Sequence, residues 1–114
     1  MRDPVHADLA DVSLAEALHG LSEPLRLAIV SLLARRGETE CNDIYNALGI
    51  SKSNASHHFR VLRACGLIWR THTGQQQTAR LRTEEFEERF PGLLAAVLAN
   101  ADSEAPDAAP RPGA

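Results

Sequence analysis

The side chains best suited to chemistry with a partner molecule lie in residues 51–65. A helix turns by about 100° per residue, so here it would gather Ala55, Phe59 and Leu62 on one side. The opposite side would then carry short or basic hydrogen-bonding side chains without a single acid. They are Lys52, Ser53, Asn54, Ser56, His57 and Arg60. Because asparagine can pair with an adenine edge and arginine with guanine or phosphate, we expect this face to read duplex DNA.

The distribution of charge supports a basic surface even though the whole chain is acidic. The 114 residues have a formal net charge of −3, which by itself argues against a nucleic-acid partner. Residues 51–82 nevertheless hold six Lys or Arg and no Asp or Glu, whereas residues 1–50 sum to −4 and residues 83–114 to −5. Such a basic island concentrates positive potential where phosphates could bind. The alternative is a solvated basic face that has no partner.

A β-hairpin is predicted directly after this helix. Residues 67–72 favour a strand, Gly74 marks a turn, and residues 78–82 alternate so that they can pair back. We expect the hairpin over 67–82 to act as a wing beside the helix over 51–65. Its candidate contacts to DNA are Arg70 and Arg80 on the strands, and Gln75 and Gln76 at the tip.

Two helices are predicted before residue 39, and one more is predicted after the hairpin. Leucines and a valine recur at helical spacing over residues 7–21, and Pro24 opens an apolar helix that ends near Gly37. A last helix begins at Thr83 and is interrupted at Pro91, because the residue before a proline disfavours helical backbone. The helix over 24–36 is apolar on more than one face, so we expect it at the centre of the core.

Residues 39–65 have the spacing of a helix-turn-helix. Thr39 is placed to cap a short helix, Gly49 to end it, and Ser51 to cap the longer helix that follows. The predicted fold is therefore mainly α with a small β-hairpin, a winged helix-turn-helix of four helices, two strands and a final helix. The expected divisions are a flexible N-terminal arm over 1–6, one domain over 7–101 and a disordered tail over 102–114.

Three stretches in order resemble the ArsR/SmtB family of small bacterial winged helix-turn-helix repressors. They read LSEPLRLAIVSLLA, then ALGISKSNASHHFRVLRACGLI, then a short hairpin that ends in ARL. The resemblance implies a transcriptional regulator, most often a repressor, that binds a palindromic operator as a symmetric homodimer. It also implies that the six polar residues of the 51–65 helix face the DNA.

The same resemblance implies that the first and last helices form the dimer. The interface residues would be Leu9, Val12, Leu14, Leu93, Leu94, Val97 and Leu98. The alternative for both apolar stripes is the core of a single protomer, since an amphipathic terminal helix fits either role.

Sensor sites known in the family are not matched by these residues. Metal-sensing members often carry ELCVCEL where this chain has Glu38–Ile44, so the paired thiolates are replaced and only Cys41 stands between them. Residues 83–101 contain no histidine for a zinc site. We therefore expect no metal and no cofactor. The alternatives are a thiol-redox or metal-responsive sensor that uses Cys41 or Cys65, and an inducer of another kind.

Other classes of protein are less consistent with the chain. It has no nucleophile motif and no Gly-rich phosphate loop, so we do not expect an enzyme. No apolar run approaches the ~18–20 residues of a membrane span, and we expect a cytoplasmic protein. The remaining alternative is a winged-helix module that binds proteins and not DNA.

Overall fold

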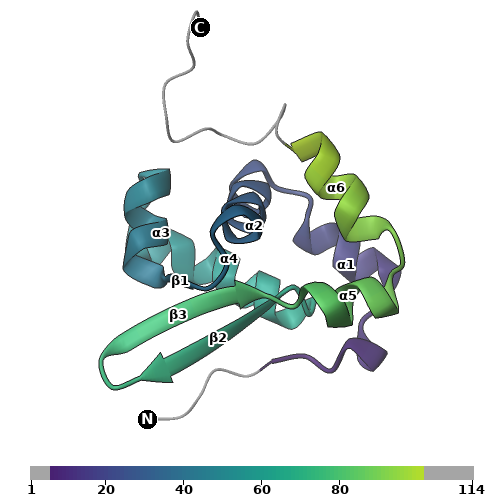
Figure 1. The fold of residues 1–114 in the computed structure, drawn as a ribbon, viewed down its shortest axis with the longest axis horizontal. Helices are drawn as coiled ribbons and strands as arrows, with labels where there is room; N and C mark the ends of the chain where they lie inside the picture. Colours follow the sequence, from purple (N-terminus) through teal and green to yellow (C-terminus); the bar gives the residue numbers. More distant parts are fainter. Residues whose placement is uncertain (1–5, 102–114) are drawn as a thin grey trace, which may run out of the picture.

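The computed structural model describes residues 6–101 of the chain. The expected tail over 102–114, and all of the expected arm over 1–6 except His6, lie outside the described residues. The elements in chain order are η1 (Leu9–Asp11), α1 (Leu14–Gly20), α2 (Pro24–Arg36), β1 (Thr39–Glu40), α3 (Cys41–Leu48), α4 (Lys52–Ala64), β2 (Ile68–Thr73), β3 (Gln76–Leu81), α5 (Thr83–Arg89) and α6 (Leu93–Ala101). Figure 1 shows the β2–β3 hairpin extending away from α5 and α6.

The predicted helix over 7–21 is wrong as a single element, because two N-caps divide it. Asp8 caps the short 3-10 helix η1 by accepting a hydrogen bond from the Ala10 amide at 3.0 Å. Ser13 then starts α1 with a capping box, in which Ser13 Oγ accepts from the Glu16 amide and Glu16 Oε1 accepts from the Ser13 amide. Each cap satisfies amides that a continuous helix would bond otherwise, so the chain changes direction between them.

The sheet has a third strand that the sequence did not indicate. Its order is β1-β3-β2, both pairings are antiparallel, and Thr39 pairs with Ala79. Thr39 is therefore a strand residue and not the predicted cap of α3, whose N-cap position is held by Glu40. The β2–β3 hairpin turns through Gly74, whose φ of 62° suits a two-residue loop with glycine first.

The remaining predicted helices are confirmed, with a break at the expected proline. Helix α2 lies at the centre, where Ile29 and Val30 are 0% exposed, and Phe59 of α4 is equally buried. Helices α3 and α4 enclose a turn in which Gly49 has the left-handed φ of 65°. Pro91 separates α5 from α6. The described residues thus form a winged helix-turn-helix whose wing is attached to the helical body by β1.

No single helix among residues 6–101 combines the length and apolarity needed to cross a bilayer. Helices α1 and α2 satisfy that test only as a pair, and they are bent by 90° at their junction.

Candidate nucleic-acid interface

Helix α4 begins and ends at well-defined positions, which fixes the direction of its faces. Ser51 Oγ accepts from the Asn54 amide at 3.1 Å, and the Cys65 amide donates to the Val61 carbonyl at the other end. Ala55, Phe59 and Leu62 are 0% exposed and pack into the core. The side of α4 opposite this apolar face is therefore directed to solvent.

The structure places all six predicted residues of α4 at exposed positions. They are Lys52, Ser53, Asn54, Ser56, His57 and Arg60. We call these six residues the α4 polar face. Lys52 lies in the first turn, where the positive end of the helix dipole adds to its charge. No acidic residue belongs to this face, so it is suited to approach a polyanion.

The four predicted wing residues divide into two environments. Gln75, Gln76 and Arg80 are exposed. Arg70 is half-buried, because its guanidinium lies 5.1 Å from the Phe59 ring centroid and donates to Gln77 Oε1. Arg70 therefore packs the wing against α4, and its NH2 group is engaged by Gln77.

Positive charge is crowded between α4 and the wing. Arg63 is half-buried, and burial, followed by the charges of Arg70 and Arg60, lowers the pKa of its guanidinium. Nε of Arg63 and Nε of Arg70 are both buried without a hydrogen-bond partner. The clustered arginines add to the positive potential beside the α4 polar face.

A small recess lies where the start of α4 meets the wing tip and α3. It has a volume of about 70 Å³. Its lining residues are Glu40, Cys41, Asn42, Tyr45, Lys52, Gln75 and Gln77. Glu40 is the one acid among these lining residues, and Lys52 is the one that belongs to the α4 polar face.

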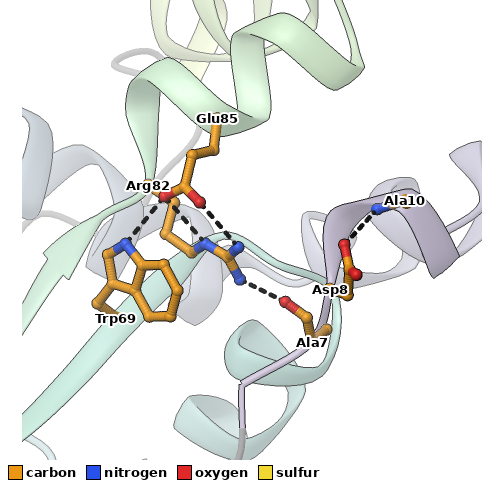
Figure 2. Close-up of polar contacts among 6 residues, drawn as sticks. All are labelled: Ala7, Asp8, Ala10, Trp69, Arg82 and Glu85. Atoms are coloured by element: carbon orange, nitrogen blue, oxygen red, sulfur yellow. Dashed lines mark hydrogen bonds and ion pairs between the residues drawn. The ribbon is translucent and has the colours of Figure 1, made fainter.

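The base of the wing is held by a polar network that sequence reasoning missed (Figure 2). Arg82 is 5% exposed, donates to the Ala7 carbonyl at 2.7 Å and pairs with Glu85 Oε2 at 3.2 Å. Its guanidinium lies 3.9 Å from the Trp69 ring centroid, and the Trp69 indole donates to Glu85 Oε1 at 3.0 Å. This network connects the wing to α5 and to the N-terminal segment, and therefore sets where the wing points.

The N-terminal segment is held by a second arginine as well. Arg89 Nε donates to the Leu9 carbonyl at 3.0 Å, and its NH2 group donates to the Val12 carbonyl at 2.7 Å. The His6 ring accepts from the Arg70 amide at 2.8 Å, on the outer edge of β2. No sequence signal pairs an arginine with a distant main-chain carbonyl, so these contacts could not be foreseen.

The residues expected at a dimer interface do not share one environment. Leu9, Val12 and Leu94 are 6%, 3% and 2% exposed and belong to the core of the protomer, the alternative that the sequence left open. Leu93, Val97 and Leu98 are half-buried at the edge of that core. Leu14 is 52% exposed, and Leu18, which was not among the expected interface residues, is 47% exposed.

Neither cysteine has the surroundings of a reactive or metal-binding thiol. Cys41 and Cys65 are each 3% exposed, and within residues 6–101 no three His, Cys, Asp or Glu side chains cluster as metal ligands would. Burial raises the pKa of both thiols, for Cys65 to about 11. A thiol with a raised pKa is a weak nucleophile at neutral pH, so these observations do not favour a thiol sensor.

Comparison with known proteins assigns the family. The model of the arsR family of bacterial regulatory proteins matches residues 23–69, which run from α2 into the wing. The chain is 33% identical over 81 residues to the HTH-type transcriptional regulator YceK of Bacillus subtilis, covering 70% of this chain and 81% of the relative. The chain belongs to the arsR family. The chain is also similar to the HTH-type transcriptional regulator CmtR of Mycobacterium tuberculosis. The two are 30% identical over 104 residues, which cover 91% of this chain and 86% of CmtR.

Solved structures agree with this assignment. The homodimeric winged helix-turn-helix DNA-binding domain Mb0332 of Mycobacterium bovis is 30% identical with a TM-score of 0.65, covering 79% of each chain. The transcriptional repressor BigR of Xylella fastidiosa is 26% identical with a TM-score of 0.61, covering 75% of this chain and 83% of BigR. The arsR-family chain is therefore a DNA-binding transcriptional regulator with a winged helix-turn-helix.

Proposed function

We propose that this arsR-family regulator is a repressor that binds a palindromic operator as a homodimer. The observation that carries the proposal is the α4 polar face, six exposed and acid-free residues on the second helix of the helix-turn-helix. Asn54, Ser56, His57 and Arg60 would read base edges in the major groove. Lys52, Ser53 and the exposed wing residues would contact the phosphates and the adjacent groove.

The dimer would form through the helices at the opposite end from the wing tip. Leu14 and Leu18 expose apolar surface on α1, and α6 adds the half-buried Leu93, Val97 and Leu98. Leucine side chains left half in water gain free energy when a second copy covers them. A two-fold axis through this surface would present two α4 helices to half-sites about one helical turn apart, roughly 34–36 Å.

The other expectations follow from this role. A DNA-binding regulator acts where the bacterial chromosome lies, so we propose a cytoplasmic protein that acts by binding and not by catalysis. We propose one domain over 7–101. We also propose that any inducer is sensed by groups other than the two buried thiols. The proposal requires no metal or cofactor.

Selection from a random pool of duplex DNA tests the whole proposal. We expect an inverted repeat with half-sites one turn apart, and an affinity that falls steeply with salt as phosphate contacts release counterions. Sedimentation of the protein with the selected duplex should give two chains per site. No enriched sequence and no salt dependence would instead support a winged-helix module that binds proteins.

A further inference from the structure

Arg26 is a buried cation that reaches the end of one helix and the side of another. It is 2% exposed on α2, and its Nε donates to the Gly20 carbonyl at 2.8 Å while its NH2 group donates to the His19 carbonyl at 3.0 Å. These carbonyls end α1, where they lack partners within the helix and where the helix dipole is negative. The charge of Arg26 is thus satisfied by the C-terminal end of α1.

The remaining side of this guanidinium faces α4. Arg26 NH1 lies 3.1 Å from Nδ1 of His58, whose side chain is buried with 8% of the residue exposed. A guanidinium only donates hydrogen bonds, so Nδ1 must accept, and the proton of the neutral ring must sit on Nε2. A protonated His58 would present a second cation to Arg26 and lose this bond.

The charged surroundings of His58 oppose its protonation. Burial makes the largest contribution to lowering the pKa of His58. The charges of Arg26 and His57 lower this pKa further, while Glu23 acts in the opposite direction. His57 is the next residue on the helix, belongs to the α4 polar face, and places its ring centroid 5.2 Å from that of His58.

Side-chain packing leaves α1 and α4 only partly in contact. An apolar cleft of about 420 Å³ is lined by residues of both helices. Its lining residues are Ala15, Glu16, His19, Val61, Ala64 and Cys65. Beside this cleft the two helices are linked by the close approach of Gly20 to Cys65 and by the polar contacts of Arg26. The same α1 exposes Leu14 and Leu18, the surface assigned above to the dimer.

We propose that His58 is a positioning residue: its hydrogen bond from Arg26 holds the DNA-reading helix α4 to the C-terminal end of α1, and DNA affinity requires His58 to be neutral. The proposal rests on the proposed function and deepens it, because it couples the helix that carries the dimer surface to the helix that reads bases. As pH falls through the pKa of His58, the bond is lost and the affinity for DNA decreases. The exposed His57 is unchanged in the variants of His58 described below, so its contribution is common to all of them.

Two substitutions at His58 separate these effects. In His58→Asn the amide oxygen takes the place of Nδ1, accepts from Arg26 and does not titrate, whereas His58→Leu removes the acceptor. We expect His58→Asn to bind the selected duplex like the wild type at about pH 7.5, and to bind increasingly more tightly than the wild type as pH falls. The difference should reach about tenfold once the pH lies about one unit below the lowered pKa of His58. We expect His58→Leu to bind about tenfold more weakly than the wild type at the higher pH. The difference between wild type and His58→Asn cancels the contributions of the other histidines and of the DNA.

Nitrogen NMR of the histidine rings supplies a readout that does not depend on DNA. We expect neutral His58 with its proton on Nε2 at about pH 7.5. A proton on Nδ1, a charged ring, or a shared pH profile for wild type and His58→Asn would overturn the proposal. Circular dichroism checks that His58→Leu is folded, and if it is not, the Asn variant and the tautomer still decide.

The outcome also distinguishes this proposal from the proposed function. A wild-type protein without salt-dependent binding to any duplex would overturn the proposed function, and with it the role of His58 in DNA affinity. A wild-type protein that binds its selected duplex, with a folded His58→Leu variant that binds equally well, would overturn the positioning role alone.

Discussion

Gly20 and Cys65 meet so closely that a β-carbon built on Gly20 would lie 2.3 Å from the sulfur of Cys65. The thiol also lies 3.5 Å from the Leu62 carbonyl, to which it donates. The absence of a side chain at Gly20 therefore leaves room for the Cys65 sulfur, and the end of α1 contacts the end of α4 at this point.

The first prediction concerns thiol reactivity. We expect both cysteines of the native protein to react with Ellman's reagent far more slowly than the same cysteines in denaturant, because each is 3% exposed and has a raised pKa. The absorbance of the released thiolate at mildly alkaline pH measures both rates. Rapid native modification, or peroxide-induced release of DNA that Cys65→Ser abolishes, would favour the thiol-sensor alternative.

The second prediction compares two glycines with similar backbone conformations. Gly66 has a φ of 79°, and a β-carbon there would lie 2.2 Å from Cδ2 of the buried Leu9, whereas Gly49 has a φ of 65° and open space around it. Gly49→Ala should lower the free energy of unfolding by about 1–2 kcal/mol through backbone strain alone. Gly66→Ala should cost about 1–3 kcal/mol more, because the core must also make room.

Urea denaturation of the two alanine variants measures this difference. The double variant Leu9→Ala/Gly66→Ala provides the control, since removing the leucine should make the second alanine less costly than it is alone. Equal losses for Gly66→Ala and Gly49→Ala would contradict the close packing of Gly66 against Leu9.

The third prediction tests the α4 polar face. Arg60→Ala should weaken specific operator binding by about 1–3 kcal/mol if Arg60 contacts a base edge. The matched control is Arg35→Ala, which removes the same charge from an exposed position on α2, outside residues 51–82. A mobility-shift titration of both variants at fixed salt compares them. Equal affinities for the two variants would remove Arg60 from the DNA-reading set.

The fourth prediction uses the carboxylate at the base of the wing. The hydrogen bond from Arg82 lowers the pKa of Glu85 below its usual value of 4.5, and the Arg82 charge and the Trp69 indole act in the same direction. The carboxylate therefore stabilises the fold above that value, and this stabilisation is lost as pH falls through the lowered pKa of the folded protein. Glu85→Gln should accordingly lose less stability than the wild type on acidification.

Thermal unfolding at a series of pH values below about 5 gives the comparison. Glu16, whose pKa is also lowered, is present in both proteins, so the difference between their curves reports Glu85. Parallel curves for wild type and Glu85→Gln would show that the pairing with Arg82 contributes nothing to stability.

Local signals made much of this fold predictable. Three of these signals affect only the backbone of neighbouring residues: the N-cap Ser51, Gly49 in the helix-turn-helix turn, and Pro91. The helices begin and end at the positions that these residues predict. The exposure of the α4 polar face followed from helical spacing in the same way.

Features that depend on distant partners were not predictable. Strand β1 is two residues long and exists because Thr39 and Glu40 pair with residues about forty positions later. The inward position of Arg70 depends on Phe59 and Gln77, and the burial of Leu9 depends on Gly66. An apolar residue at helical spacing is compatible with a core or with an interface, and only the packed structure distinguishes the two.

The carbonyls that accept hydrogen bonds from Arg82 and Arg89 belong to the main chain of residues 7–12. These two arginines therefore bind the backbone of this segment and not its side chains. Exchanging the exposed residues Ala10 or Asp11, whose side chains make none of these contacts, should leave those three acceptors where they are. Deleting any one residue between Ala7 and Val12 would shift at least one of these carbonyls out of reach of its arginine. Residues 7–12 should therefore tolerate substitution at these two exposed positions better than a change in length.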